Sequence, residues 1–346
     1  MGLIITILAF IFILGVTVTI HEFGHFLFAK KAGIYVYEFS IGMGPRLFKF
    51  NRKNDETDYS IRLLPIGGYV QMAGEDIEVD KSIPKDKQLQ SKTWLQRFLT
   101  MVAGVMFNFL LAIVVLFIVA LINGVPTDET KISKSSIKGL KVGDKIVSVD
   151  GKSVNNYDEL ALELTAAGNH KFKMKVKHEN NKYSTVTAKL KTVYSKKNKL
   201  KEYTYGFEID QAKYEHNLLL SIKYAFTKFF SMIEQMFFTV WYLITGKISL
   251  KLLSGPVGIF SVVGIAAKKG FVSVLSLLAL ISVNVGFINL LPIPAFDGGH
   301  ILFLIIEKIK GSKVNPKVEN TIHTVFFILL MVLMLYITFN DILRLT

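Results

Sequence analysis

The sequence predicts a polytopic α-helical membrane protein with about four transmembrane helices and an inserted soluble α/β domain. The 346-residue chain is 51% hydrophobic and holds several long apolar runs. A lysine-rich stretch with strand-like alternation, residues 124–210, separates two of these runs. The first run contains ionisable residues, "HEFGH" at 21–25. Such residues inside a span are costly and usually mark a functional site.

Four apolar segments are close to the roughly 20 residues that cross a hydrocarbon core as a helix. They are residues 3–28, 99–122, 272–292 and 321–339. The first segment has neither a basic n-region nor a small-residue cleavage site ahead of its polar residues. We therefore expect a retained helix and not a signal peptide.

Positive charge beside the spans predicts the topology. Lys30 and Lys31 follow the first span, and the loop 307–319 carries four lysines. The positive-inside rule places both regions in the cytoplasm, so both termini and residues 124–210 are expected outside. The lysines of 124–210 do not oppose this, because long domains translocate largely regardless of charge.

The chain is expected to divide into four parts. Residues 1–123 and 271–346 would form the two halves of a membrane core, 124–210 a soluble domain, and 211–270 an amphipathic or interfacial helical segment. The net charge of +14 is explained by lysines bordering the spans. Because no recognition helix or aromatic-basic module is visible, nucleic-acid binding is not expected.

The soluble domain begins with a recognisable pattern of turns. "IKGLKVGDKIVSVDG" at 137–151 reads as a turn, a short alternating strand and a second turn, and a helix should begin near Asn156 or Asp158. The pattern resembles bacterial PDZ domains, which bind peptides by adding a strand to a sheet edge. An ordinary turn–strand–turn of another small β domain is the alternative.

Residues 215–247 show apolar positions at steps of three and four, which is typical of an amphipathic helix. A fifth span over 229–245 is the rival interpretation, and Glu234 in its middle makes it less favourable. "SGPVGI" at 254–259 is expected to form a turn before the last membrane section.

The motif "HEFGH" has the spacing of a metal site. Positions i and i+4 share one helix face, so His21 and His25 can bind one metal with Glu22 beside a bound water, as in zincins. The chain has no cysteine, so only His, Asp or Glu can complete the site. A satisfied polar cluster between helices is the alternative reading.

A catalytic zinc usually has three protein ligands, and "NVGFINLLPIPAFDGGH" at 284–300 supplies candidates for the third. Its prolines should break the helix, and broken backbone at membrane depth is tolerated where it lines a site. Asp297 is the expected ligand and His300 its rival. Asn289 either contacts substrate or satisfies backbone groups that the prolines set free.

These paired motifs and the PDZ-like domain between them resemble the site-2 protease family, specifically the bacterial regulator-of-sigma-E-protease branch with a single PDZ domain. The resemblance covers almost the whole chain. It implies that His21, His25 and Asp297 are the zinc ligands. It also implies that Glu22 is the catalytic acid/base and that Asn289 positions substrate.

Further segments are similar to the family. "IGMGPRL" at 41–47 and "LPIGGYVQM" at 64–72 resemble a membrane-associated β-hairpin on the cytoplasmic side, in which Gly67 and Gly68 would contact substrate. Asn108 matches a family motif in the second span. Val105 stands where the family usually has proline, which leaves open the bend of that helix.

The resemblance also implies a function and a location. We expect a zinc-dependent intramembrane endopeptidase of the bacterial inner (cytoplasmic) membrane, with its active site toward the cytoplasm. Its substrates would be single-span proteins already trimmed outside, such as anti-sigma factors or signal-peptide remnants. Another type of membrane zincin, or a PDZ-containing membrane scaffold or transporter without enzymatic activity, are the alternatives.

Overall fold

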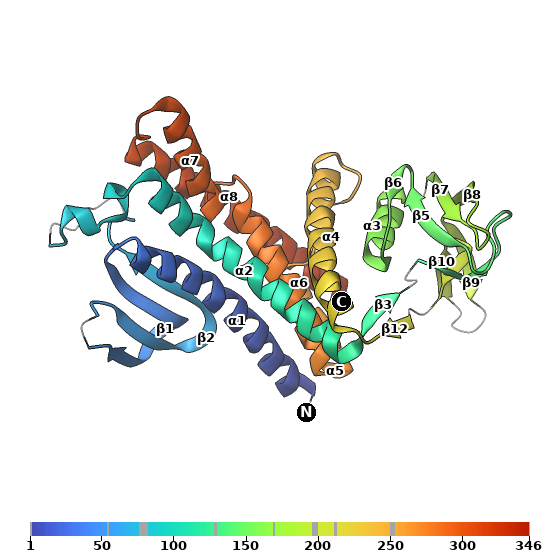
Figure 1. The fold of residues 1–346 in the computed structure, drawn as a ribbon, viewed down its shortest axis with the longest axis horizontal. Helices are drawn as coiled ribbons and strands as arrows, with labels where there is room; N and C mark the ends of the chain where they lie inside the picture. Colours follow the sequence, from blue (N-terminus) through green and yellow to red (C-terminus); the bar gives the residue numbers. More distant parts are fainter. Residues whose placement is uncertain are drawn as a thin grey trace. The chain divides into compact units, whose positions relative to one another are not determined.

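The computed structural model describes residues 2–53, 55–75, 82–127, 130–168, 170–195, 200–210, 213–249 and 253–345. The chain forms two compact units (Figure 1). One comprises residues 1–119 and 253–346, and the other comprises residues 120–252.

The first unit is built on helices. They are α1 (Gly2–Lys31), α2 (Trp94–Asn123), α5 (Pro256–Lys269), α6 (Phe271–Leu290), α7 (Asp297–Lys310) and α8 (Pro316–Leu345), with the short 3-10 turns η1 (Lys85–Lys87) and η2 (Leu89–Ser91). Within the described residues, four helices are long and apolar enough to cross a membrane: α1, α2, α6 and α8. A helix is present at each of the four predicted spans, and α2 runs through Val105 as one helix.

A long β-hairpin packs beside α1 in this unit (Figure 1). Its strands β1 (Val36–Asn51) and β2 (Asp58–Met72) are antiparallel, with several shifts of register. The buried carboxylate of Glu38 accepts hydrogen bonds from Arg46, Arg62 and Tyr69. The bonds from Arg62 and Tyr69 of β2 tie the two strands together, whereas Arg46 belongs to the same strand as Glu38.

The segment "SGPVGI" does not form the expected turn, because α5 begins within it at Pro256. Proline is pre-organised for the first position of a helix. The carboxylate Oδ2 of Asp341 in α8 accepts hydrogen bonds from the backbone N–H groups of Gly255 and Gly258, both at 2.8 Å. A distant residue therefore supplies the cap that starts this helix.

The second unit is the predicted β-rich insert. Its strands are β3 (Val125–Thr127), β4 (Ile132–Ser135), β5 (Lys145–Val149), β6 (Lys152–Ser153), β7 (Lys171–Lys177), β8 (Tyr183–Lys189), β9 (Lys191–Ser195), β10 (Leu200–Thr204), β11 (Phe207–Ile209) and β12 (Lys213–Glu215). The largest sheet is antiparallel, in the order β6-β5-β7-β8. The smaller sheets pair β4 with β11, β3 with β12 and β9 with β10.

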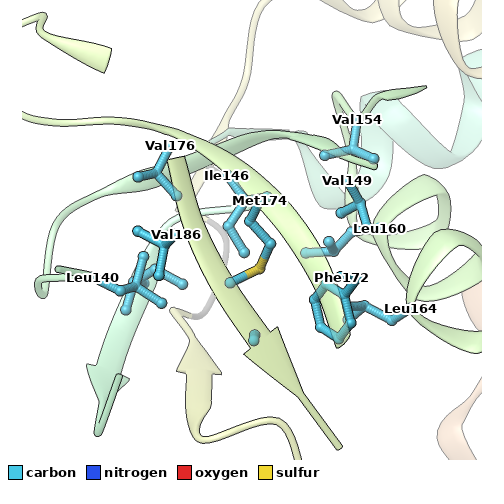
Figure 2. Close-up of a cluster of buried hydrophobic side chains, with 12 residues drawn as sticks. Leu140, Ile146, Val149, Val154, Leu160, Leu164, Phe172, Met174, Val176 and Val186 are labelled. Carbon is cyan, nitrogen blue, oxygen red and sulfur yellow. The ribbon is translucent and has the colours of Figure 1, made fainter. Parts of the chain in front are cut away.

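Helix α3 (Tyr157–Ala167) covers the core of this unit. The Asn156 side chain accepts a hydrogen bond from the Glu159 backbone N–H and caps the helix, as the sequence predicts. Leu160 and Leu164 of α3 pack with strand residues such as Ile146 and Met174 (Figure 2). The helix and the four-stranded sheet thus share one apolar core. The likeness to a PDZ domain stays a prediction.

Helix α4 (Leu218–Ile244) packs on α3 through polar groups. Its buried Tyr242 lies 2.7 Å from a carboxylate oxygen of Glu163, and Ser231 bonds to Asn156 and Glu159. Exposed apolar side chains, among them Phe226, lie elsewhere on the helix. The helix is amphipathic, as expected, and it is not among the four candidate spans.

Candidate metal centre

Helix α1 brings two imidazoles together. His21 and His25 are one turn apart on the same face, and each is 6% exposed. Their Nε2 atoms are 3.2 Å apart. The expected convergence of the two histidines is present.

Asp297 reaches this pair from the start of α7. Its Oδ2 lies 3.0 Å from Nε2 of His21 and 3.2 Å from Nε2 of His25. The predicted break is also present, because α6 ends at Leu290 and α7 begins at Asp297. The prolines between the two helices cannot continue a helical hydrogen-bond ladder.

The glycines after Asp297 permit this tight reversal of the chain. A methyl group on Gly298 would lie 1.9 Å from the carbonyl oxygen of Leu291, and one on Gly299 would lie 2.7 Å from Cα of Pro294. Any side chain at either position would push the loop off the helix start. The two glycines therefore allow the loop to pack against the start of the helix that carries Asp297.

The outer nitrogen of each imidazole has a partner in α2. Nδ1 of His25 donates to the carbonyl oxygen of Thr100 at 2.8 Å, which leaves Nε2 with a lone pair. Nδ1 of His21 faces the side-chain amide of buried Asn108 at 3.2 Å. If the Asn108 amide is rotated by half a turn, its Oδ1 accepts a hydrogen bond from the His21 Nδ1–H. This gives a partner to Oδ1, which otherwise has none within the described residues.

Three lone pairs therefore converge on one point. Oδ2 of Asp297 is buried without a hydrogen-bond donor in the part of the chain that the structure describes. A tetrahedral Zn²⁺ with bonds of about 2.0–2.1 Å separates neighbouring ligand atoms by roughly 3.3–3.4 Å. The observed separations of 3.0 to 3.2 Å are close to this, so the three residues can hold a zinc ion.

Close approach of α2 to α1 depends on glycines that the sequence reasoning did not single out. A methyl group on Gly104 would lie 2.3 Å from Nε2 of His25 and 2.8 Å from Nε2 of His21. A methyl group on Gly24, inside the motif, would lie 2.5 Å from the carbonyl oxygen of Ala103. The sequence signal was a glycine within an otherwise bulky apolar span, "VAGVMF".

Glu22 lies between the two histidines and the hairpin. Its carboxylate accepts a hydrogen bond from the backbone N–H of Val70 in β2. A methyl group on Gly68 would meet Cγ of Glu22 at 3.8 Å and the carbonyl oxygen of Ser40 at 2.6 Å. The hairpin thus holds the glutamate that the motif supplies, and Gly68 allows the close fit.

The other predicted site residues occupy different places. Nδ2 of Asn289 is 3.5 Å from Nε2 of His21, which puts its amide beside the converging ligand atoms. Gly67 has a φ of 84°, and the nearest atom to an added methyl would be Cε of Met43. His300 is not part of the triad and lies in a second cluster with Glu319 and His323.

Comparison with known proteins gives one consistent result. The model of peptidase family M50 matches residues 9–333. A Fusobacterium nucleatum protein, FN1322, is 38% identical over 350 residues, which cover 98% of this chain and 99% of its own. Zinc metalloprotease RasP of Geobacillus kaustophilus is 32% identical over 419 positions, covering 97% of each chain. RasP of Bacillus licheniformis is 32% identical over 423 positions, covering 98% of this chain and 99% of its own.

Proposed function

The chain belongs to peptidase family M50 and is a membrane zinc metalloprotease, and from this premise we propose that it cleaves peptide bonds within the transmembrane segments of single-span proteins. The observation that carries the proposal is the convergence of three ligand atoms, two of them on a helix long and apolar enough to span a membrane. Water must reach this point for hydrolysis to occur. The ligand helix ends at Lys31, so the path from the cytoplasm is short.

In this proposal His21, His25 and Asp297 hold Zn²⁺, which polarises a peptide carbonyl and activates water when it is bound. Glu22 accepts a proton from the attacking water and passes it to the leaving amine. The Val70 N–H keeps the carboxylate aimed at the reacting atoms. The Asn289 amide, which lies next to His21, would position the substrate backbone.

The hairpin is proposed to hold the substrate in an extended form. A helical substrate hides its carbonyl groups in internal hydrogen bonds, so it must unwind before attack. β1 and β2 form a two-stranded sheet, which leaves strand edges open among the described residues. A substrate strand added at such an edge, near Gly67 and Gly68, would run close to Glu22.

The charge pattern supports the proposed topology, and the likeness to the family supports the proposed substrates. In a multi-pass protein of the bacterial inner membrane, the lysines beside the spans favour an orientation with both termini and the soluble unit outside and the zinc toward the cytoplasm. Substrates would be anti-sigma-factor-like proteins or signal-peptide remnants that a first protease has shortened outside. The soluble unit would then act as a filter against untrimmed substrates.

Metal analysis tests the ligand assignment. In the purified full-length protein, His21→Ala and Asp297→Ala should each remove about one equivalent of zinc relative to wild type, because both supply a ligand to the same ion. Exposed His170, changed to Ala, is the matched control and should keep all of it. Zinc retained in Asp297→Ala would show that another group is the third ligand.

A further inference from the structure

A second group of potential metal ligands lies in the first unit, outside the proposed active site. His300 in the first turns of α7 and Glu319 and His323 of α8 each offer one ligand atom, and these atoms all lie within 4.8 Å of one another. Glu319 and His323 are four residues apart on one face of α8. The cluster therefore joins two helices that are consecutive in the chain.

The contacts inside this cluster leave one nitrogen without a partner. Nδ1 of His300 is 3.4 Å from Oε1 of Glu319, and the rings of His300 and His323 stack with their centroids 4.2 Å apart. Nε2 of His323 is buried and has no hydrogen-bond partner among the residues that the structure describes. Buried polar atoms are nearly always satisfied, so an unpaired imidazole nitrogen on a residue that lies beside two other potential ligands points to a missing ligand.

We propose that His300, Glu319 and His323 bind a second divalent transition-metal ion, of the Zn²⁺ class. Two imidazoles and one carboxylate suit zinc and its neighbours, whereas Ca²⁺ and Mg²⁺ prefer oxygen ligands alone. The ligand atoms must move closer by up to about 1.5 Å to reach the spacing of a tetrahedral ion. Rotation about side-chain bonds of partly exposed residues achieves this, and it would tilt the rings out of their stack.

The surroundings of the three residues have space for such an ion, and the nearby positive charges described below are already paired. A cavity of about 830 Å³ adjoins the three residues and is large enough for water in the remaining coordination position. Two cations on its wall are already engaged. Arg97 pairs with Glu307, and Nζ of Lys313 donates to the carbonyl oxygen of Gln90.

The position of the ion would give it a structural role. His300 is three residues after Asp297, so both lie in the first turns of α7. An ion that binds His300 to two residues of α8 would fasten the beginning of α7. It would thereby steady the helix that presents Asp297 to the first metal, without touching substrate itself.

The test counts zinc in the full-length protein purified in detergent. Wild type should hold about two equivalents, His21→Ala about one, and the double variant His21→Ala/His323→Ala none. Single variants His300→Gln and Glu319→Gln should each lose one equivalent and keep the one that depends on His21. His170→Ala, an exposed histidine of the other unit, should change nothing.

Cobalt provides a second readout that does not depend on cleavage. Co²⁺ added to the metal-free His21→Ala variant should give the visible absorption of a four-coordinate site. Adding the His300→Gln substitution to this variant should abolish the absorption. A wild-type protein with a single equivalent that His21→Ala removes completely would overturn the proposal, and so would unchanged zinc in a folded His323→Ala variant. If instead the proposed active site does not bind zinc, the protein would still hold the one equivalent of zinc that depends on His323, so the two failures can be told apart.

Discussion

Gly104 controls how closely α2 approaches the histidines of α1. We predict that Gly104→Ala removes the zinc equivalent that depends on His21, because the added methyl would occupy the space of both Nε2 atoms. The loss of affinity should exceed roughly 100-fold, the upper end for disturbing the outer contacts of a metal ligand. Competition with a chelator measures it.

The matched control for this variant is Gly2→Ala at the start of α1, where an added methyl meets nothing within 4 Å. It should keep wild-type zinc affinity. Wild-type affinity in Gly104→Ala would mean that the two helices separate at little cost, and the tight packing described above would then not be needed for the site.

The site residues that the sequence predicts lie within one helical turn of each other or directly after a helix break. His21, Glu22 and His25 are read from their spacing alone, and Asp297 from its place after two helix-breaking prolines. Gly104 and Asn108 stand out in the sequence as a small residue in a bulky span and a match to a family motif, but their contacts with the histidines depend on how α2 crosses α1. The same holds for Glu319 and His323, which meet His300 only because α8 folds back beside α7.

Among the elements, the hairpin depends on the ionised carboxylate of Glu38. Burial raises the pKa of this group, but hydrogen bonds from Ser60, Tyr69, Arg62 and Arg46 outweigh burial and lower the pKa from 4.5 to about 2. The folded hairpin therefore binds this proton less readily than the unfolded chain does. Its stabilisation is present above about pH 4.5 and is lost as the pH falls toward 2.

We therefore predict that the melting temperature of wild type falls more steeply between pH 5 and pH 3 than that of Glu38→Gln, which has no carboxylate to protonate. Thermal unfolding in detergent at several pH values measures this difference. Parallel curves for the two proteins would mean that Glu38 does not contribute to the pH dependence of stability.

Elements whose ends depend on distant residues are the ones that sequence reasoning missed. The length of the apolar runs at the spans, and the apolar periodicity of residues 215–247, predict helices where the structure has them. "SGPVGI" looks like a turn because it carries two glycines and a proline. Asp341, 83 residues beyond Gly258 in sequence, caps the helix there instead, and a local reading cannot anticipate this partner.

For the whole molecule, the proposed filter can be tested by removing the soluble unit. The structure shows that α4 packs on α3 by buried polar groups, so the excision should take both and replace residues 125–247 with a short linker. We predict that zinc is retained and that a substrate with its outer domain intact is now cleaved.

The measurement is the cleavage rate of one substrate with and without its outer domain, by the full-length and the shortened protein. If the shortened protein cleaves the trimmed substrate more slowly and still rejects the untrimmed one, the soluble unit recruits substrate and does not filter it. Membrane class and enzyme family are apparent in the sequence. The proposed selection of substrate by the soluble unit corresponds to no motif in the sequence.

The proposed role of Glu22, beside zinc bound by His21, His25 and Asp297, is to drive cleavage within a transmembrane segment. Its most direct test is mass spectrometry of the products formed from a trimmed single-span substrate in lipid vesicles with purified protein. Wild type should cut inside the membrane segment, and Glu22→Gln should retain zinc while its rate falls by at least about 100-fold, because glutamine cannot accept the proton. Undiminished cleavage by Glu22→Gln, or a cut outside the membrane segment, would contradict this role.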